Sequence, residues 1–134
     1  MASPNLDLVR SIYADWERGD FSSTEWADPN IEAVWADGPS PSTHIGLAGM
    51  ADGMREVVSA WEAWSVQAEQ YRELDRNRVI VLYRASARGK ASGVDLGLMQ
   101  ARGVTLFHVC DGKVTHVVIY WNRDRALADL GLAS

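Results

Sequence analysis

Tryptophan is the residue type that most suggests a binding function, because the 134-residue chain has 6 tryptophans among its aromatic residues. Rings of that size fill a core, line an apolar pocket or sit in an interface. Each tryptophan therefore marks either packing or a surface for a flat, apolar ligand. A tryptophan supplies no acid, base or nucleophile, so the six support a pocket more than a reaction.

Histidine and cysteine indicate no metal or disulfide chemistry. Cys110 is the only cysteine, which excludes an intrachain disulfide and a cysteine-based metal site and fits a reducing compartment. His108 and His116 are expected on opposite faces of a hairpin, which argues against a shared metal. His44 is expected in a loop, as a lid over a cavity or as a solvated side chain. We expect no metal and no cofactor.

Composition indicates one globular domain over residues 1–134. Hydrophobic residues make up 47% of the chain and charged residues 23%, as in ordinary folded proteins. The net charge of −5 argues against nucleic acid and anionic membranes as partners. No apolar stretch approaches the ~18 residues of a membrane span, and no signal peptide is visible, so a cytoplasmic location is expected.

Apolar residues recur every three or four positions in the first half of the chain, which predicts helices. The first lies between Pro4 and Gly19, and a short second one is expected after the capping pattern of residues 22–25. A third is predicted from Met54 to Trp64, and a last one follows Asn122 and ends at Gly131.

Alternating apolar residues predict a first strand over residues 31–36 and four long strands over 66–74, 79–90, 94–109 and 113–121. Gly97 and Gly103 suggest bends in the longest strand, so the sheet should curl. Helices followed by a curled antiparallel sheet predict an α+β domain with a natural cavity.

The register of the last hairpin has two alternatives, which place different residues inside. A two-residue turn at Asp111-Gly112 puts His108 on the face of Val117, whereas a three-residue loop puts Thr105 and Phe107 there. One residue of register therefore decides which side chains line the interior.

Five segments carry a resemblance to a known family: YADWERGDF (13–21), DPNIEAVWADGP (28–39), DGMREVV (52–58), SGVDLG (92–97) and HVCDGKVTHVVIYWNRDRALADLGL (108–132). With the order of elements, they make the chain similar to SnoaL-like proteins of the nuclear transport factor 2-like superfamily, which includes ketosteroid isomerase and limonene epoxide hydrolase. The resemblance implies a cone-shaped curled sheet closed by N-terminal helices, a cystatin-like α+β roll. It also favours the register with Thr105 and Phe107 inside.

The resemblance does not carry over a known catalytic set. The oxyanion tyrosine of ketosteroid isomerase falls at Ile12, next to Tyr13, and its buried aspartate falls at Thr105, so that oxyanion hole is missing. Its general base falls near residues 35–37, which makes Asp37 the best acid/base candidate. The alternative for Asp37 is a turn residue that satisfies backbone N–H groups.

Arg84 matches a pocket-facing position in the family, where an unpaired guanidinium would be costly. It would pair with an acid such as Asp37 or await an anionic or carbonyl ligand. The alternative is an outward-facing arginine on an exposed strand. The epoxide hydrolase mechanism is also in doubt, because Arg102 lacks the aspartate two residues later that the mechanism needs.

The resemblance implies a ligand site that is largely apolar, suited to a polyketide-, terpenoid- or steroid-like molecule. The alternative is a solid aromatic core without a cavity. The expected lining residues are Trp16, Trp35, Trp61, Leu82, Thr105, Phe107 and Trp121.

The outer face of the sheet predicts a homodimer, because Val114, Val118 and Tyr120 make that face apolar as well. Two functions stay open from the sequence. One is an isomerase, cyclase or hydrolase with Asp37 as base and Arg84 as electrophile. The other is a non-catalytic domain that binds or carries a hydrophobic ligand.

Overall fold

The computed structural model of the chain describes residues 4–20, 24–37, 41–91 and 94–132, without the side chains of residues 57–64, 87–91 and 94–101. Within these ranges the elements are α1 (Pro4–Glu17), β1 (Ala27–Trp35), β2 (Ser42–Ile45), α2 (Gly46–Ala60), β3 (Trp61–Glu73), β4 (Arg78–Ala91), β5 (Val94–Cys110), β6 (Lys113–Tyr120) and α3 (Arg123–Asp129). The strands form one sheet in the order β2-β1-β6-β5-β4-β3, so β2 and β3 are its free edges.

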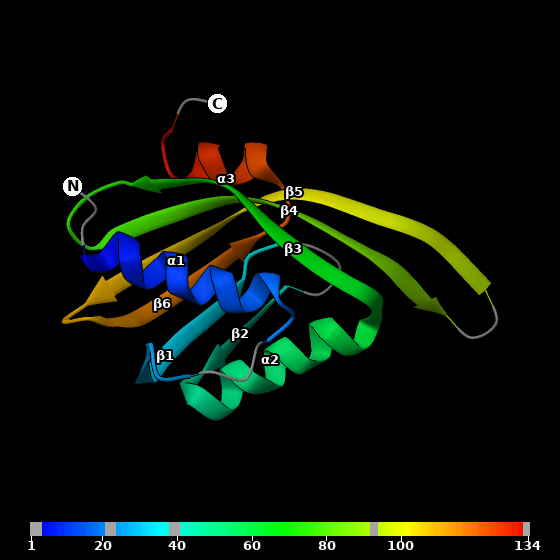
Figure 1. Cartoon of the computed structure of the whole chain (residues 1–134), viewed down its shortest axis with the longest axis horizontal. Coiled ribbons are helices and arrows are strands. Elements are labelled where there is room, and N and C mark those ends of the chain that lie inside the picture. The colour runs from blue at the N-terminus through cyan, green and yellow to red at the C-terminus, as the bar shows by residue number, and fades with distance from the viewer. Residues whose placement is uncertain (1–3, 21–23, 38–40, 92–93, 133–134) are drawn as a thin grey trace.

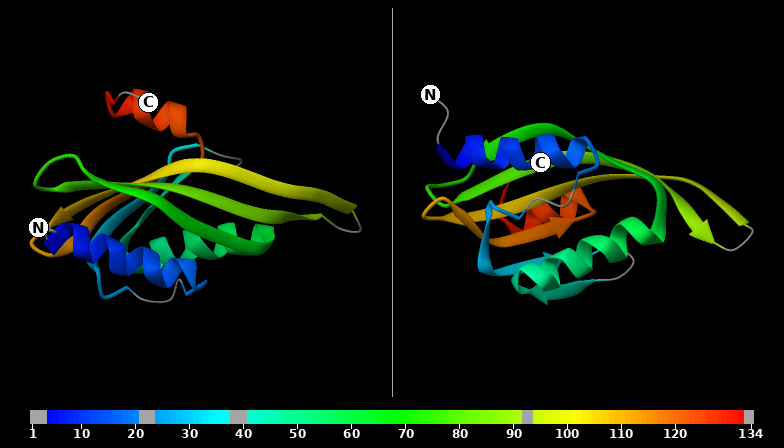
Figure 2. Two further views of the ribbon diagram at one scale, coloured as in Figure 1. Left: turned by 45° about the horizontal axis from the view of Figure 1, so that its top comes forward. Right: turned by 60° about the horizontal axis from the view of Figure 1, so that its bottom comes forward.

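The sheet curls around α1 and α2, while α3 lies on the opposite face (Figures 1 and 2). This arrangement confirms the predicted α+β fold with a curled sheet and helices on its concave side. The prediction of an entirely antiparallel sheet is wrong at one pair of strands, because β1 runs parallel to β6. None of the helices in the described residues is long and apolar enough to cross a membrane.

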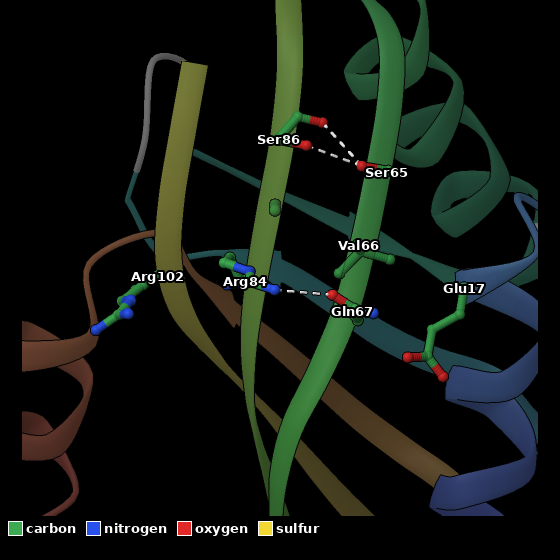
Figure 3. Close-up of a pocket in the computed structure, with 8 residues that line it drawn as sticks. Glu17, Ser65, Val66, Gln67, Arg84, Ser86 and Arg102 are labelled. Carbon is green, nitrogen blue, oxygen red and sulfur yellow. Dashed lines mark hydrogen bonds between the residues drawn. The ribbon is translucent and has the colours of Figure 1, made fainter. Parts of the chain in front are cut away.

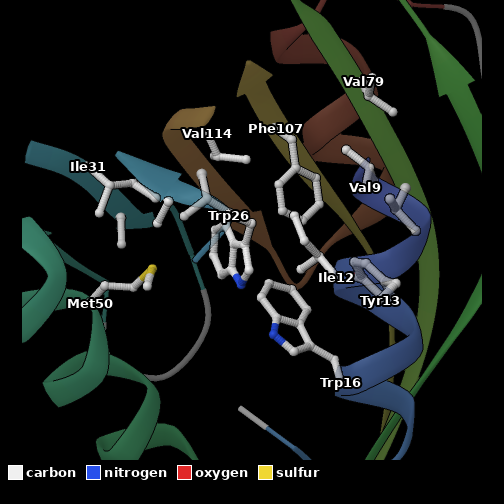
Figure 4. Close-up of a cluster of buried hydrophobic side chains, with 14 of the residues drawn as sticks. Val9, Ile12, Tyr13, Trp16, Trp26, Ile31, Met50, Val79, Phe107 and Val114 are labelled. Atoms are coloured by element: carbon white, nitrogen blue, oxygen red, sulfur yellow. The ribbon is translucent and has the colours of Figure 1, made fainter. Parts of the chain in front are cut away.

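Strand alternation divides the core into two clusters. On β4, Val79 and Val81 belong to the large cluster under α1 and α2, whereas Ile80 and Leu82 belong to a smaller cluster under α3. From α1, the large cluster receives Val9, Ile12, Tyr13 and Trp16, the residues whose spacing predicts that helix. Figure 4 shows the large cluster between α1, α2 and the sheet.

Two predicted helices differ from the structure. The predicted helix over residues 54–64 ends at Ala60, and Trp61 already begins β3 opposite Gly89. Pairing with the long β4 strand outweighs the helical spacing of the tryptophans, because helical propensity is only a weak preference. No short helix lies between residue 24 and Ala27, where β1 begins, while residues 22 and 23 are outside the described ranges. β2 occupies part of a predicted loop.

The hairpin between β5 and β6 combines the two predicted alternatives. Asp111 (φ 51°) and Gly112 (φ 78°) form a two-residue turn between the paired residues Cys110 and Lys113. The pairing then shifts by one residue, because Thr115 has no partner on β5 and forms a β-bulge.

Beyond this bulge, Thr105 pairs with Ile119 and Phe107 with Val117. Thr105 and Phe107 are both buried. They therefore face the interior, as the longer loop would have required, although the turn itself has two residues.

The same bulge changes which residues lie on the outer face. Val114 faces the large cluster instead of the outside. Val118 and Tyr120 do lie on the outer side, where they pack in the cluster that contains Ala126 of α3. α3 therefore covers part of the apolar face from which a homodimer was predicted, and the homodimer stays a prediction.

Candidate functional site

The concave side of the sheet is filled by aromatic rings. Trp16 lies 5.1 Å from Tyr13, 5.8 Å from Phe107 and 6.0 Å from Trp26 between ring centroids, within the usual range of aromatic pairs. These four side chains are at most 8% exposed. The described part of the interior is thus a packed core, which favours the solid-core alternative of the sequence analysis for these residues.

Two buried hydroxyl groups contact each other within this described part of the core. The hydroxyl groups of Tyr13 and Thr105 are 2.8 Å apart, and both residues are 1% exposed. Burial raises the pKa of Tyr13 well above its usual value, so the phenol stays neutral at physiological pH. The resemblance to ketosteroid isomerase placed the oxyanion tyrosine at Ile12, but the structure brings Tyr13, one residue along the helix, to Thr105.

Asp37 joins the end of β1 to the start of α3. Its carboxylate oxygens accept hydrogen bonds from the backbone N–H groups of Trp121 and Asn122, and Asn122 is the N-cap of α3. The alternative of a backbone-satisfying residue is thus what the structure shows, although the N–H groups lie far along the chain. Catalysis by Asp37 stays a prediction.

Tyr83 lies beside Asp37 and was not singled out from the sequence. Its hydroxyl donates to the carbonyl of Tyr120 at 2.7 Å, and burial, followed by the charge of Asp37, raises its pKa. A Cβ at Gly103, the partner of Tyr83 on β5, would lie 2.0 Å from that carbonyl oxygen. Gly103 is therefore required for this close approach, which the sequence signalled only as a bend.

An open pocket of about 740 Å³ lies along β3, β4 and β5 (Figure 3). Gln67, Arg84 and Arg102 are paired in register, so they project from the face of α3. Val66 and Ala85 belong to the large cluster on the other face, so the lining comes from both faces of these strands. Arg84 donates to the side-chain carbonyl of Gln67 at 3.0 Å. The described lining residues are Glu17, Ser65, Val66, Gln67, Arg84, Ala85, Ser86 and Arg102. The described lining is more polar than the sequence predicted.

Two further contacts shape this pocket. The hydroxyl groups of Ser65 and Ser86 are 2.9 Å apart across β3 and β4. Glu17, at the end of α1, accepts a hydrogen bond from the backbone N–H of Ala68 at 3.2 Å. The free edge of β3 is thereby partly capped by a side chain.

The charge next to the pocket is mainly positive. Arg123 of α3 donates to Glu69 on β3 and to the backbone carbonyl of Tyr83, both at 2.8 Å. The pKa of Glu69 is lowered, first by the hydrogen bond from Arg123 and further by the charges of Arg102 and Arg84. Glu69 is thus engaged by Arg123, while Arg84 contacts a neutral amide.

The structure does not bring the predicted site residues together. Trp16, Trp35 and Phe107 lie in the large cluster with Thr105 beside them. The expectation for Leu82 is wrong in position, because it packs on the outer side under α3.

Arg84 is likewise exposed on the outer side, since it alternates with the inward Tyr83 and Ala85. Its predicted pairing with Asp37 is not found among the described side chains, because Arg84 donates to Gln67 instead. Trp121 is half-buried and its backbone bonds to Asp37. Trp61 begins β3, but its side chain is outside the described residues.

The histidines also differ from expectation. The bulge places His108 directly opposite His116 on one face, with ring centroids 5.6 Å apart, where opposite faces were predicted. Even so, the described residues contain no group of three side chains suited to a metal ion. His44 lies in β2 instead of the expected loop, with its ring 5.5 Å from that of Trp35.

The class of protein is defined by the fold of this sheet and its helices. A structure of TerC crystallised with polyporic acid is 20% identical, with a TM-score of 0.74 over 96% of this chain and 98% of that chain. A protein from Xanthomonas campestris proposed to be a polyketide cyclase is 21% identical, with a TM-score of 0.70 over 93% and 95%. A nuclear transport factor 2-like protein of unknown function from Burkholderia pseudomallei is 16% identical, with a TM-score of 0.76 over 95% and 97%.

At these identities the likeness establishes the nuclear transport factor 2-like fold alone. The sequence establishes more, because the family model of the SnoaL-like domain matches residues 9–117. The chain therefore belongs to the SnoaL-like domain family. No curated protein sequence matches the chain.

Proposed function

We propose that this chain binds a small, flat, polyketide-like organic molecule in the open pocket along β3, β4 and β5. The observation that carries the proposal is the contrast between this pocket and the packed interior. Its volume of about 740 Å³ falls within the roughly 300–1,000 Å³ typical of ligand sites. Structural neighbours that include a proposed polyketide cyclase and a complex with polyporic acid support this class of ligand.

The interior is the weaker candidate for the same ligand. Trp16, Trp26 and Phe107 contact one another, so a ligand there would have to displace buried rings. Displacing such rings costs several kcal/mol of packing, on the order of a large core truncation. The pocket requires no such rearrangement.

Catalysis is the second candidate function, in the form of an isomerase, cyclase or hydrolase. Asp37 favours catalysis, because its carboxylate is buried at the margin of the aromatic interior. The geometry favours binding over turnover, because Asp37 lies beside Tyr83 whereas Arg84 projects from the opposite face of β4. A base and an electrophile on opposite faces would not meet one small substrate. Turnover that disappears in Asp37→Asn while ligand affinity is retained would establish the catalytic form.

Binding can be tested with naphthalene-2-carboxamide, a flat neutral probe. In a ¹H–¹⁵N spectrum of the whole chain, the probe should shift the amides of Ser65, Gln67 and Ser86. Ser86→Trp should abolish these shifts, because the indole would occupy the pocket, while Ser11→Trp on the exposed side of α1 should leave them unchanged. Shifts confined to Trp16 and Phe107, or no shifts at all, would overturn the proposal.

A further inference from the structure

Arg84 is a guanidinium without a carboxylate partner among the side chains that the structure describes. It is exposed on β4 and donates to the neutral side chain of Gln67. None of the ion pairs found among the described side chains involves Arg84 or Arg102. By contrast Arg18, Arg55, Arg78, Arg123 and Arg125 each pair with a carboxylate.

Glu69, an acid that feels the charge of Arg84, already forms an ion pair with another arginine. Glu69 bonds to Arg123 at 2.8 Å, and Arg84 and Arg102 add to the positive field around it. Glu17, the acid among the described lining residues of the pocket, accepts a hydrogen bond from the backbone N–H of Ala68. The described part of the pocket wall therefore carries more positive than negative charge.

We propose that Arg84 is the anchor for a carboxylate group of the ligand, and that the pocket selects planar organic acids over their neutral analogues. This inference rests on the proposed function and specifies the ligand class of the same pocket. A guanidinium has five N–H donors in a planar fork that matches a carboxylate, and the structure uses one nitrogen of Arg84 for Gln67. The remaining donors are available to a carboxylate.

Gln67 and Arg102 have supporting parts in this subsite. The contact at 3.0 Å with Gln67 orients the guanidinium on the sheet, as a positioned donor requires. Arg102 is the β5 partner of Arg84, and in Figure 3 its side chain points away from Arg84. Arg102 therefore adds positive potential to the site without sharing the carboxylate. Substituting Arg84 should weaken acid binding more than substituting Arg102.

The test compares 2-naphthoate with naphthalene-2-carboxamide, which have the same ring and differ in charge. Titrations of the whole chain should show tighter binding of 2-naphthoate, and Arg84→Gln should weaken it at least about tenfold, the loss expected of one charge-assisted pair. Arg84→Lys should retain part of the affinity, because it keeps the charge but not the fork. Arg102→Gln should have a smaller effect.

Controls separate this inference from the proposed function. The carboxamide affinity should change less than about threefold in every variant, and Arg55→Gln on α2 should change neither probe. The unfolding temperatures of the variants should match that of the natural chain, because Arg84 is exposed. If both probes shift the pocket amides equally and Arg84→Gln alters neither, the anion subsite is wrong and the pocket stands. If neither probe shifts those amides, the proposed function fails together with the subsite.

Discussion

The two faces of the curled sheet differ in what they expose. The concave face is closed by α1 and α2 and filled by rings such as Trp16 and Phe107. The outer face is covered by the seven-residue helix α3 over part of its area, and beyond it carries Arg84, Gln67 and Arg102. In the described core, the aromatic residues therefore stabilise the fold. We expect the polar residues of the other face to select the ligand.

The largest effect should come from the concave face. Phe107→Ala is expected to lower the free energy of unfolding by about 3–5 kcal/mol, because the ring is fully buried and leaves a cavity. Urea unfolding measures the loss. Leu106→Ala, the neighbour that points to the outer face and is only partly buried, should cost less than half as much. Equal losses would contradict the contrast between the faces.

The next largest effect should come from the junction that Asp37 forms. Asp37→Asn places an amide N–H₂ against a backbone N–H of Trp121 or Asn122 and should cost about 1–3 kcal/mol, the range for an unsatisfied buried group. Thermal unfolding at neutral pH measures it. Asp111→Asn, at a turn residue with φ 51°, should be nearly neutral, because asparagine tolerates that conformation. An unchanged stability in Asp37→Asn would show that the contact is not structural.

The buried hydroxyl pair should give a smaller effect with a distinctive pattern. Tyr13→Phe leaves Thr105 without its partner and should cost about 1–2 kcal/mol, as should Thr105→Val. The double variant should cost clearly less than the two single losses combined, since it leaves no orphaned hydroxyl. Strict additivity in chemical denaturation would show that the two groups are not coupled.

The smallest effect concerns the outer face and depends on pH. Because the hydrogen bond from Arg123 lowers the folded-state pKa of Glu69, Glu69 stabilises the fold at neutral pH and loses that contribution as pH falls through its folded-state value. Unfolding midpoints at pH 7 and pH 3 should therefore differ slightly more in the natural chain than in Glu69→Gln. Glu25→Gln, at an exposed residue, is the matched control. If Glu69→Gln has the same pH dependence of unfolding as the natural chain, the contact between Glu69 and Arg123 does not stabilise the fold.

Local patterns predicted much of this fold, and contacts distant in sequence were harder to predict. The spacing of Val9, Ile12 and Trp16 predicts α1 because one helical face packs on the sheet. The helical spacing of Trp61 and Trp64 failed, because pairing with β4 is not encoded in the segment itself. The contact of Asp37 with Trp121 joins residues 84 positions apart, and no local pattern reports such a contact.

The candidate pocket was predicted only in part for the same reason. Arg84 was singled out, but its partner Gln67 and the neighbouring Ser65 and Ser86 have no motif of their own. They become a group only when β3 and β4 pair in register. Their face, on the opposite side from the aromatic core, depends on the twist and bulges of long strands, which composition does not specify.

The bulge at Thr115 adds one unpaired residue to β6 and so shifts the alternation of inward and outward side chains by one position. Upstream of it, Val114 points to the core, and downstream Val117 and Ile119 do so, although three positions separate Val114 from Val117. Without Thr115, the residues Val114, His116 and Val117 would alternate regularly and could keep their present partners on β5, so the same side chains would stay inside. A single deletion at this position would thus straighten the strand without changing which residues form the core, and length variation in relatives should be tolerated there.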